Sequence, residues 1–141
     1  MKEFELIKEI VSTQPFIKLL GIELLEAGPG WVRERLAVNE KLLQPGVVHG
    51  GAIYSLADTA AAHAVLTKVY PDEWVTTVEQ KINFLRPVTS GILMCHSHVL
   101  HLGKRIGYCE AEITADSGKL VAKSTATIMR LSRTALPPDT L

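Results

Sequence analysis

The sequence predicts an α+β fold in which a mostly antiparallel sheet wraps around one long central helix. Residues 50–70 are rich in alanine and have almost no polar face, a pattern typical of a buried helix. On both sides of this segment, apolar and polar residues alternate in short runs separated by turn residues, which is typical of strands. A sheet and an apolar helix can each bury the other's apolar surface, so the two patterns together favour this two-layer arrangement.

The N-terminal segment predicts one or two short amphipathic helices, because apolar residues recur at helical spacing and Pro15 interrupts the run. We expect these helices to cap an open end of the core. Residues 22–38 change to a period of two around a Gly-Pro-Gly turn at 28–30, which predicts a hairpin. The patterns depend on Phe4, Ile7, Ile10, Val11, Phe16, Leu19 and Leu20 for the helices and on Val32, Leu36 and Val38 for the second strand.

Four further strands are predicted after the helix. Residues 39–48, which precede the helix, contain a Pro-Gly pair and are expected to form a loop. The segments with a strand pattern are 78–87, with Val78, Ile82 and Phe84 on one face, then 91–102, 106–115 and 120–131. The expected order is therefore hairpin, buried helix and four strands.

Length and composition predict a single globular domain. The chain has 141 residues, of which 47% are hydrophobic and 21% charged, close to the average of globular proteins. We expect the domain to span residues 1–134 and residues 135–141 to form a frayed tail, because two prolines there cannot continue a strand or helix. Lys and Arg number 15 and Asp and Glu number 15, so nucleic acid is not an expected partner.

The sequence predicts neither a membrane span nor a signal peptide. The longest apolar stretch, residues 52–69, is interrupted by Asp58, His63 and Lys68, and no apolar region follows the charged N-terminus. We therefore expect a cytoplasmic protein, in which the two cysteines, at positions 95 and 109, are reduced core thiols.

The start of the predicted helix carries the first candidate site, His49-Gly50-Gly51. Adjacent glycines allow another group to approach the backbone closely, and the first N–H groups of a helix have no partner within it. Such donors suit a carbonyl oxygen that becomes negative during acyl transfer, where one donor lowers the barrier by about 3 kcal/mol. A tight turn with a helix cap is the simpler interpretation of the same two glycines.

Asp58 is the second candidate. It is the one carboxylate between Glu40 and Asp72 and lies in the middle of the apolar helix, so it must be paired, protonated or open to a cavity. The alternative is an Asp that meets a polar neighbour or solvent at a helix edge. Gly51 and Asp58 are seven residues apart, about 10 Å along the helix, so one chain cannot bring both to one carbonyl. A homodimer with antiparallel helices across a two-fold axis would do so.

Two motifs carry a family resemblance. His49-Gly50-Gly51-Ala-Ile-Tyr-Ser-Leu-Ala-Asp58, together with residues 78–88 and Gly91, resembles the PaaI-like hotdog-fold acyl-CoA thioesterases over about 100 residues. The resemblance implies a hotdog fold, an acyl-CoA substrate and a dimer whose sheets join, often paired again into a tetramer. It implies no metal and no cofactor, since coenzyme A is part of the substrate.

The resemblance also implies roles for single residues. Asp58 matches the catalytic carboxylate, Gly51 the backbone oxyanion donor, His49 the histidine that orders the loop, and Thr77 a hydroxyl that holds water or the carboxylate. Many relatives have an amide six residues before the histidine. Leu43 stands there in this chain, so Gln44 is our substitute for that amide.

Other polar residues have two interpretations each. His96, His98 and His101 have a spacing that allows metal ligation, but no carboxylate accompanies them and surface histidines are the better interpretation. His63 lies about 140° around the helix from Asp58, which favours an interface or helix-end group over a partner of Asp58. Basic residues that can meet the phosphates of coenzyme A, or lie in solvated turns, are Lys81, Arg86, Lys104 and Arg105. Tyr54 borders either the acyl channel or the core.

The predicted reaction is hydrolysis of an acyl- or aryl-CoA thioester to a carboxylic acid and free coenzyme A. The Gly51 N–H would polarise the carbonyl, and Asp58 would act as general base or as nucleophile. Two other classes stay open. A hotdog hydratase or dehydratase would use a His and a carboxylate on the same type of substrate, and a non-catalytic acyl-CoA-binding protein would not need Asp58.

Overall fold

The computed structural model describes residues 2–135, so the predicted tail lies outside the described residues from position 136 on. The helices are α1 (Lys2–Ser12), α2 (Pro15–Leu20) and α3 (Gly50–Val69), with short 3-10 turns at Glu40–Leu42 and Arg133–Ala135. The strands are β1 (Ile22–Gly28), β2 (Trp31–Ala37), β3 (Leu43–Gln44), β4 (Val47–Val48), β5 (Glu73–Phe84), β6 (Ile92–Leu102), β7 (Ile106–Thr114) and β8 (Leu120–Ser132).

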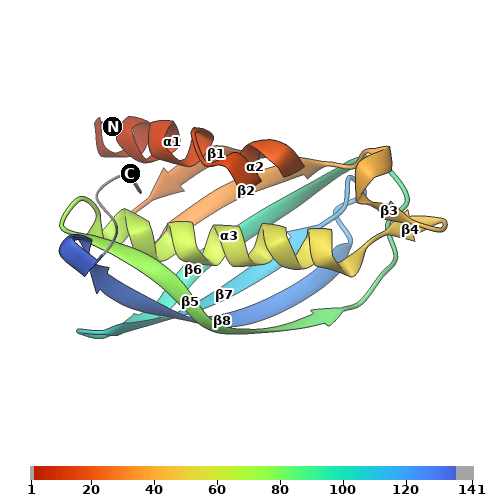
Figure 1. Cartoon of the computed structure of the whole chain (residues 1–141). Helices are drawn as coiled ribbons and strands as arrows, with labels where there is room; N and C mark the ends of the chain where they lie inside the picture. The colour runs from red at the N-terminus through yellow and green to blue at the C-terminus, as the bar shows by residue number, and fades with distance from the viewer. Residues whose placement is uncertain (1, 136–141) are drawn as a thin grey trace.

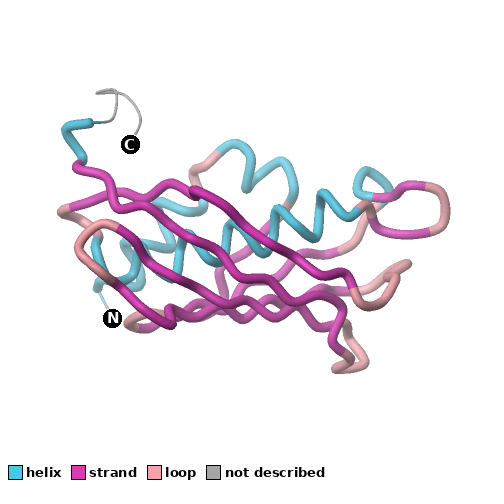
Figure 2. The backbone as a smooth tube through the Cα atoms, turned by 90° about the horizontal axis from the view of Figure 1, so that it is seen from below, coloured by secondary structure: helices cyan, strands magenta, loops and turns pink. Residues whose placement is uncertain are grey.

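Six strands form one antiparallel sheet in the order β1-β2-β6-β7-β8-β5, which curves along α3 (Figures 1 and 2). The predicted α+β hotdog arrangement is confirmed. β1 and β5 are the two edges of this sheet. Because β5 follows α3 directly, the helix and this edge strand run side by side in opposite directions (Figure 1).

The helix is buried because it is apolar on every side. Eleven residues of α3 are buried, and they contact the sheet and α1. β7 lies close to the helix at Gly107, where an added Cβ atom would lie 2.9 Å from Val65 Cγ2. Glycine at this position therefore lets β7 and α3 pack in direct contact.

The N-terminal helices agree with the prediction. They contact β1, and α1 also contacts α3, so they cover the core beside the first edge of the sheet (Figure 1). Pro15 begins α2, and Gly21 ends it with a φ of +79°, a conformation that glycine adopts without strain.

Two segments differ from the prediction. The expected loop at 39–48 contains a 3-10 turn and the small hairpin β3–β4, which projects beyond the start of α3 (Figure 1). The strand expected from residue 78 begins at Glu73, because the β-branched residues before Val78 extend the ladder with β8 without alternating in polarity. Its register shifts next to Val78, and the side chains of Val78 and Phe84 are 53% and 51% exposed. The face that was predicted to carry Val78 and Phe84 is therefore exposed at both positions in the single chain.

Both cysteines are free and buried in the sheet, as predicted. Burial raises the pKa of the Cys109 thiol to about 12. Burial and the negative charge of Glu34 raise the pKa of the Cys95 thiol well above its usual range. Among residues 2–135, no helix combines the length and apolarity that a membrane crossing requires.

Candidate active site

The start of α3 is capped by the side chain of His49. Its Nδ1 atom accepts a hydrogen bond of 2.7 Å from the N–H of Gly51, and an added Cβ on Gly51 would lie 2.9 Å from the same nitrogen. The expectation that Gly51 offers a free oxyanion donor is therefore wrong: this N–H is already bonded. His49 thus caps the first turn of α3, and the loop-ordering role that the resemblance implied stays a prediction.

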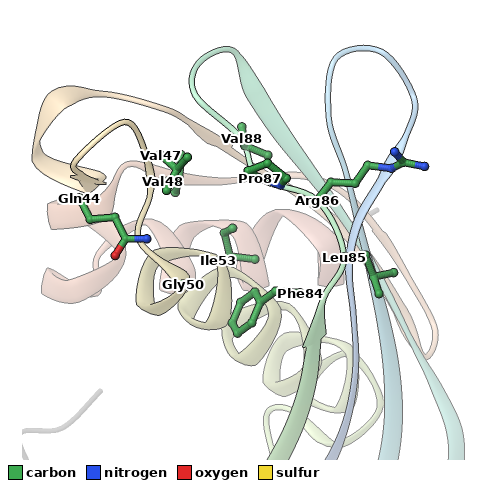
Figure 3. A pocket seen from close by; sticks show the side chains of 10 residues that line it. All are labelled: Gln44, Val47, Val48, Gly50, Ile53, Phe84, Leu85, Arg86, Pro87 and Val88. Carbon is green, nitrogen blue, oxygen red and sulfur yellow. The ribbon is translucent and has the colours of Figure 1, made fainter.

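Gly50 takes the place of Gly51 as the available donor. Its N–H belongs to the first turn of α3, and no acceptor for it is present within the described part of the chain. Gly50 lines a cavity of about 370 Å³ together with Gln44, Ile53, Phe84 and Arg86 (Figure 3). A side chain on Gly50 would come within 3.2 Å of the Phe84 ring, so glycine keeps this approach to the backbone open.

Two other predicted residues also border this cavity. Gln44 ends β3, and its amide lies near the start of α3 in Figure 3. Arg86 is exposed, and its side chain extends away from the other labelled residues in the same view.

Asp58 lies in the middle of α3, half-buried and paired with β5. The hydroxyl of Thr77 donates a hydrogen bond of 2.6 Å to Asp58 Oδ1. This is the contact that the resemblance implied for Thr77. Both residues border a second cavity, of about 270 Å³, which is separate from the one at Gly50.

One face of α3 follows the edge strand β5 along its length. Phe84 lies against Gly50, the Gln80 amide donates a hydrogen bond of 3.1 Å to the Tyr54 carbonyl, and Thr77 bonds Asp58. Tyr54 is exposed on this face. Gly50 and Asp58 are eight residues apart, about 12 Å along the helix. A single chain thus presents the donor and the carboxylate beside the same strand but does not bring them together.

The basic residues do not form one group. Lys104 and Arg105 are exposed in the turn between β6 and β7. The Arg130 guanidinium donates to the neighbouring Gly103 carbonyl and to Glu73, so this turn lies at the start of β5. Arg86 follows the end of β5, at the opposite end of the sheet. Within one chain these cations therefore lie at two different ends of the sheet, and their contact with coenzyme A stays a prediction.

The histidines of β6 do not form a metal-binding group with the carboxylates of the described residues. Across residues 2–135, no group of three His, Cys, Asp or Glu side chains is arranged to hold a metal ion. His96 is exposed and packs edge-on against Trp31, with 6.0 Å between ring centroids.

His63 is buried and forms a pair with Glu34 of β2 through its Nδ1 atom, so its interpretation as an interface or helix-end group is wrong. Glu34 was not identified from the sequence as a buried polar residue. The signal was present in the sequence, because Glu34 lies between Val32 and Leu36, the inward positions of an alternating strand.

A comparison with protein-family models decides the family, because the thioesterase superfamily model matches residues 45–122, more than half of the chain. The chain belongs to the thioesterase superfamily. The matched region begins just before the glycine turn and includes Asp58 and Thr77. Thioester hydrolysis is thus the general chemistry of this family.

Curated relatives of this thioesterase cover most of its length. It is 34% identical over 110 residues to the 1,4-dihydroxy-2-naphthoyl-CoA hydrolase of Listeria monocytogenes, covering 77% of this chain and 89% of the relative. It is 31% identical over 122 residues to a putative esterase of Saccharolobus solfataricus, covering 86% of this chain and 81% of the relative.

Solved structures show the same fold. The E. coli PaaI protein from the phenylacetic acid degradation operon matches with a TM-score of 0.82 at 28% identity, covering 88% of this thioesterase and 89% of PaaI. A thioesterase from Haemophilus influenzae matches with a TM-score of 0.83 at 28% identity, covering 92% of this chain and 90% of that one.

Proposed function

We propose that this thioesterase hydrolyses acyl- or aryl-CoA thioesters at sites shared between two copies of the chain. In each site the Gly50 N–H of one protomer polarises the thioester carbonyl, and Asp58 of the partner subunit acts on the carbonyl carbon. The observation that carries the proposal is the placement of Gly50 and the Asp58–Thr77 pair along the same edge strand, about 12 Å apart.

The open edge of β5 supports a homodimer. The strand is twelve residues long and pairs only with β8 in the described sheet, and it leaves Val78 and Phe84 exposed. A long edge with apolar side chains is a template for another strand. If two β5 strands pair antiparallel about a two-fold axis, the helix start of one protomer approaches the middle of the partner's helix.

The hydrogen bond from Thr77 prepares the carboxylate. It occupies Oδ1 of Asp58 and holds the side chain in one orientation, which leaves Oδ2 for the reaction. In the base route, Asp58 takes a proton from water while the water oxygen adds to the carbonyl carbon. The C–S bond then breaks, and the proton passes to the departing thiolate of coenzyme A. In the nucleophilic route, Oδ2 adds to the carbonyl carbon, the thiolate leaves, and water hydrolyses the resulting anhydride.

The residues around Gly50 support substrate binding in this proposal. His49 fixes the first turn of α3, and Gln44 offers an amide to water or to the thioester in the same cavity. We assign to Arg86, which is exposed at the border of this cavity, contact with a phosphate of coenzyme A outside the cavity, a role for which a guanidinium is suited. The Listeria relative is a CoA hydrolase, which supports coenzyme A as the thiol part of the substrate.

Release of free thiol from aryl-, short-, medium- and long-chain acyl-CoAs tests the proposal. We expect wild type to release thiol from at least one member and Asp58→Asn to lose at least 99% of that rate, as removal of a catalytic group does (about 100-fold or more). Binding without thiol release would indicate an acyl-CoA-binding protein, and hydration of an enoyl-CoA would indicate a hydratase. Either result would overturn the proposal.

A further inference from the structure

The contacts between β5 and α3 limit how two copies of β5 can pair. Phe84 lies against Gly50, and Thr77 bonds Asp58, so positions 84 and 77 mark the two halves of the proposed site on the strand. For Gly50 of one protomer to approach Asp58 of the partner subunit, Phe84 must lie close to the partner's Thr77. In an antiparallel pair this places the two-fold axis near the midpoint of the two positions, between residues 80 and 81.

Symmetry restricts the position of the axis further. When two copies of one strand pair antiparallel about a two-fold axis, the residue at the axis stands directly opposite its own copy. A charged residue at this position meets a like charge, which destabilises the pair. Lys81 would do so, and so would Glu79 on the other side of Gln80. Of these three residues, Gln80 is the one that can face its own copy without repulsion.

The charges beside Gln80 fit a register centred on this residue. Gln80 stands opposite Ala126 of β8, which is 1% exposed, and its amide bonds the Tyr54 carbonyl, so its side chain lies on the helix face of the sheet. Glu79 and Lys81 therefore lie on the outer face. Both are exposed, and neither has an ion-pair partner within the described chain. With Gln80 at the axis, each Glu79 stands opposite the partner's Lys81, an attractive pair.

The Gln80 amide has hydrogen-bonding capacity that the single chain does not use. Its Nε2 atom donates one N–H to the Tyr54 carbonyl at 3.1 Å, which fixes the orientation of the amide because a carbonyl oxygen can only accept. The Oε1 atom is buried without a hydrogen-bond partner in the described structure, which is a costly arrangement. A second copy of the same amide carries the N–H that this oxygen needs, and side-chain rotations that bring such groups together are common at interfaces.

From these observations we infer that two copies of β5 pair in the register that places Gln80 opposite the partner's Gln80. On the helix face the two amides bond each other, and on the outer face Glu79 pairs with the partner's Lys81 on both sides of the axis. The same register brings Phe84 close to the partner's Thr77, so that the two halves of each proposed site meet. The inference rests on the proposed function and adds to it the contact surface between the two copies.

Cysteine cross-linking tests the register, because a disulfide forms only between residues that lie close together. Under mild oxidation, Gln80→Cys is expected to give at least about five times as much covalent dimer as Glu79→Cys or Lys81→Cys alone. A refolded equal mixture of Glu79→Cys and Lys81→Cys should again form the covalent dimer, because these two positions face each other. Wild type, whose two cysteines are buried, is the control and should remain uncross-linked.

Charge reversal tests the pairs on the outer face. Glu79→Lys places lysines opposite each other on both sides of the axis and should raise the dimer dissociation constant about 5- to 50-fold, and Lys81→Glu should have the same effect with carboxylates. The double variant Glu79→Lys/Lys81→Glu restores opposite charges and should return the constant to within about threefold of wild type. Sedimentation at a series of protein concentrations measures these constants.

Gln80→Met tests the bond between the two amides, because methionine keeps the length of the side chain and removes its hydrogen bonds. The dimer dissociation constant should rise about 5- to 30-fold, the effect of losing two hydrogen bonds across the axis. An unchanged constant would show that the amides do not bond each other.

Cross-linking and association need no substrate, so this inference and the function on which it rests can fail separately. A covalent dimer formed best by Glu79→Cys or Lys81→Cys alone, or formed by none of the variants, would overturn the register and leave thioester hydrolysis unaffected. A double charge reversal that stays as weak as the single ones would overturn it as well. If Gln80→Cys cross-links as expected while wild type releases no thiol from any thioester, the proposed hydrolysis fails and the contact surface stands.

Discussion

The two edges of the sheet are built differently. β1 is seven residues long and contacts both N-terminal helices. Its Glu23 and Glu26 form exposed ion pairs with β2, and its register shifts between Leu24 and Glu26. These features protect a strand edge against further pairing. β5 is twelve residues long and exposes Val78 and Phe84 beside the candidate catalytic residues. The difference supports the proposal that the β5 edge, unlike the protected β1 edge, pairs with a second copy of the chain.

The largest effect is expected from a charge at the open edge. Val78→Lys should convert the homodimer to a monomer and reduce thioester hydrolysis by about 100-fold or more, because each shared site loses one half. Sedimentation velocity and thiol release measure both effects. Glu26→Lys places the same side chain on the β1 edge and should change neither. A Val78→Lys protein that is monomeric and fully active would show that one chain holds a complete site.

Mixed dimers test the sharing of sites directly. Asp58→Asn and Gly50→Val homodimers should each be inactive, the latter because a side chain at Gly50 meets the Phe84 ring. After unfolding and refolding of an equal mixture, activity should return to about a quarter of the wild-type value, since half of the dimers are mixed and each has one intact site. Continued inactivity of a mixture that contains verified heterodimers would argue against sharing.

A smaller effect is expected at Thr77. Thr77→Val removes the hydrogen bond to Asp58 Oδ1 and should lower kcat by about 5- to 10-fold, the value of one such bond, with little change in KM. Thr77→Ser keeps the hydroxyl and should recover most of the loss. If both variants have wild-type kcat, this bond does not orient the carboxylate during the reaction.

The smallest effect of the Val78→Lys substitution is expected on the labelling of the two cysteines in the middle of the sheet. Cys95 and Cys109 are buried and their pKa values are raised, so iodoacetamide should modify them slowly in the folded protein and rapidly in urea. Because the thiolate reacts, the rate should still be rising with pH at about pH 9, above the usual thiol pKa. Val78→Lys should leave this rate unchanged. Rapid labelling of that variant would show that loss of the edge contact opens the core.

The fold was predictable wherever the sequence has a clear period. The alternating strands and the apolar helix at 50–70 appear as expected, because burial on one face or on all faces leaves a direct trace in the sequence. The start of β5 was missed because residues 75–78 are β-branched on both faces and carry no alternation. Its register shift depends on pairing with β8, a contact distant in sequence.

The candidate site was predictable in part. Asp58 was identifiable as a carboxylate in an apolar helix, and the motif resemblance pointed to Thr77. The choice between Gly50 and Gly51 required the conformation of the His49 side chain, which occupies one of the two donors. The partner of His63 is Glu34, which lies on β2, 29 residues away in the sequence. No local pattern in the sequence encodes this pairing.

The close contact between Gly107 and Val65 affects the position of Asp58, the proposed catalytic carboxylate. Val65, which it touches, lies seven residues beyond Asp58 on α3, and a methyl group at position 107 would meet the Val65 side chain at 2.9 Å. Either the Val65 side chain or the helix would have to shift to relieve this overlap, and a shift of the helix would move Asp58 relative to Thr77 on the neighbouring strand. The alignment of the chemical groups on one side of the helix thus depends on the absence of a single carbon atom on the sheet beneath it.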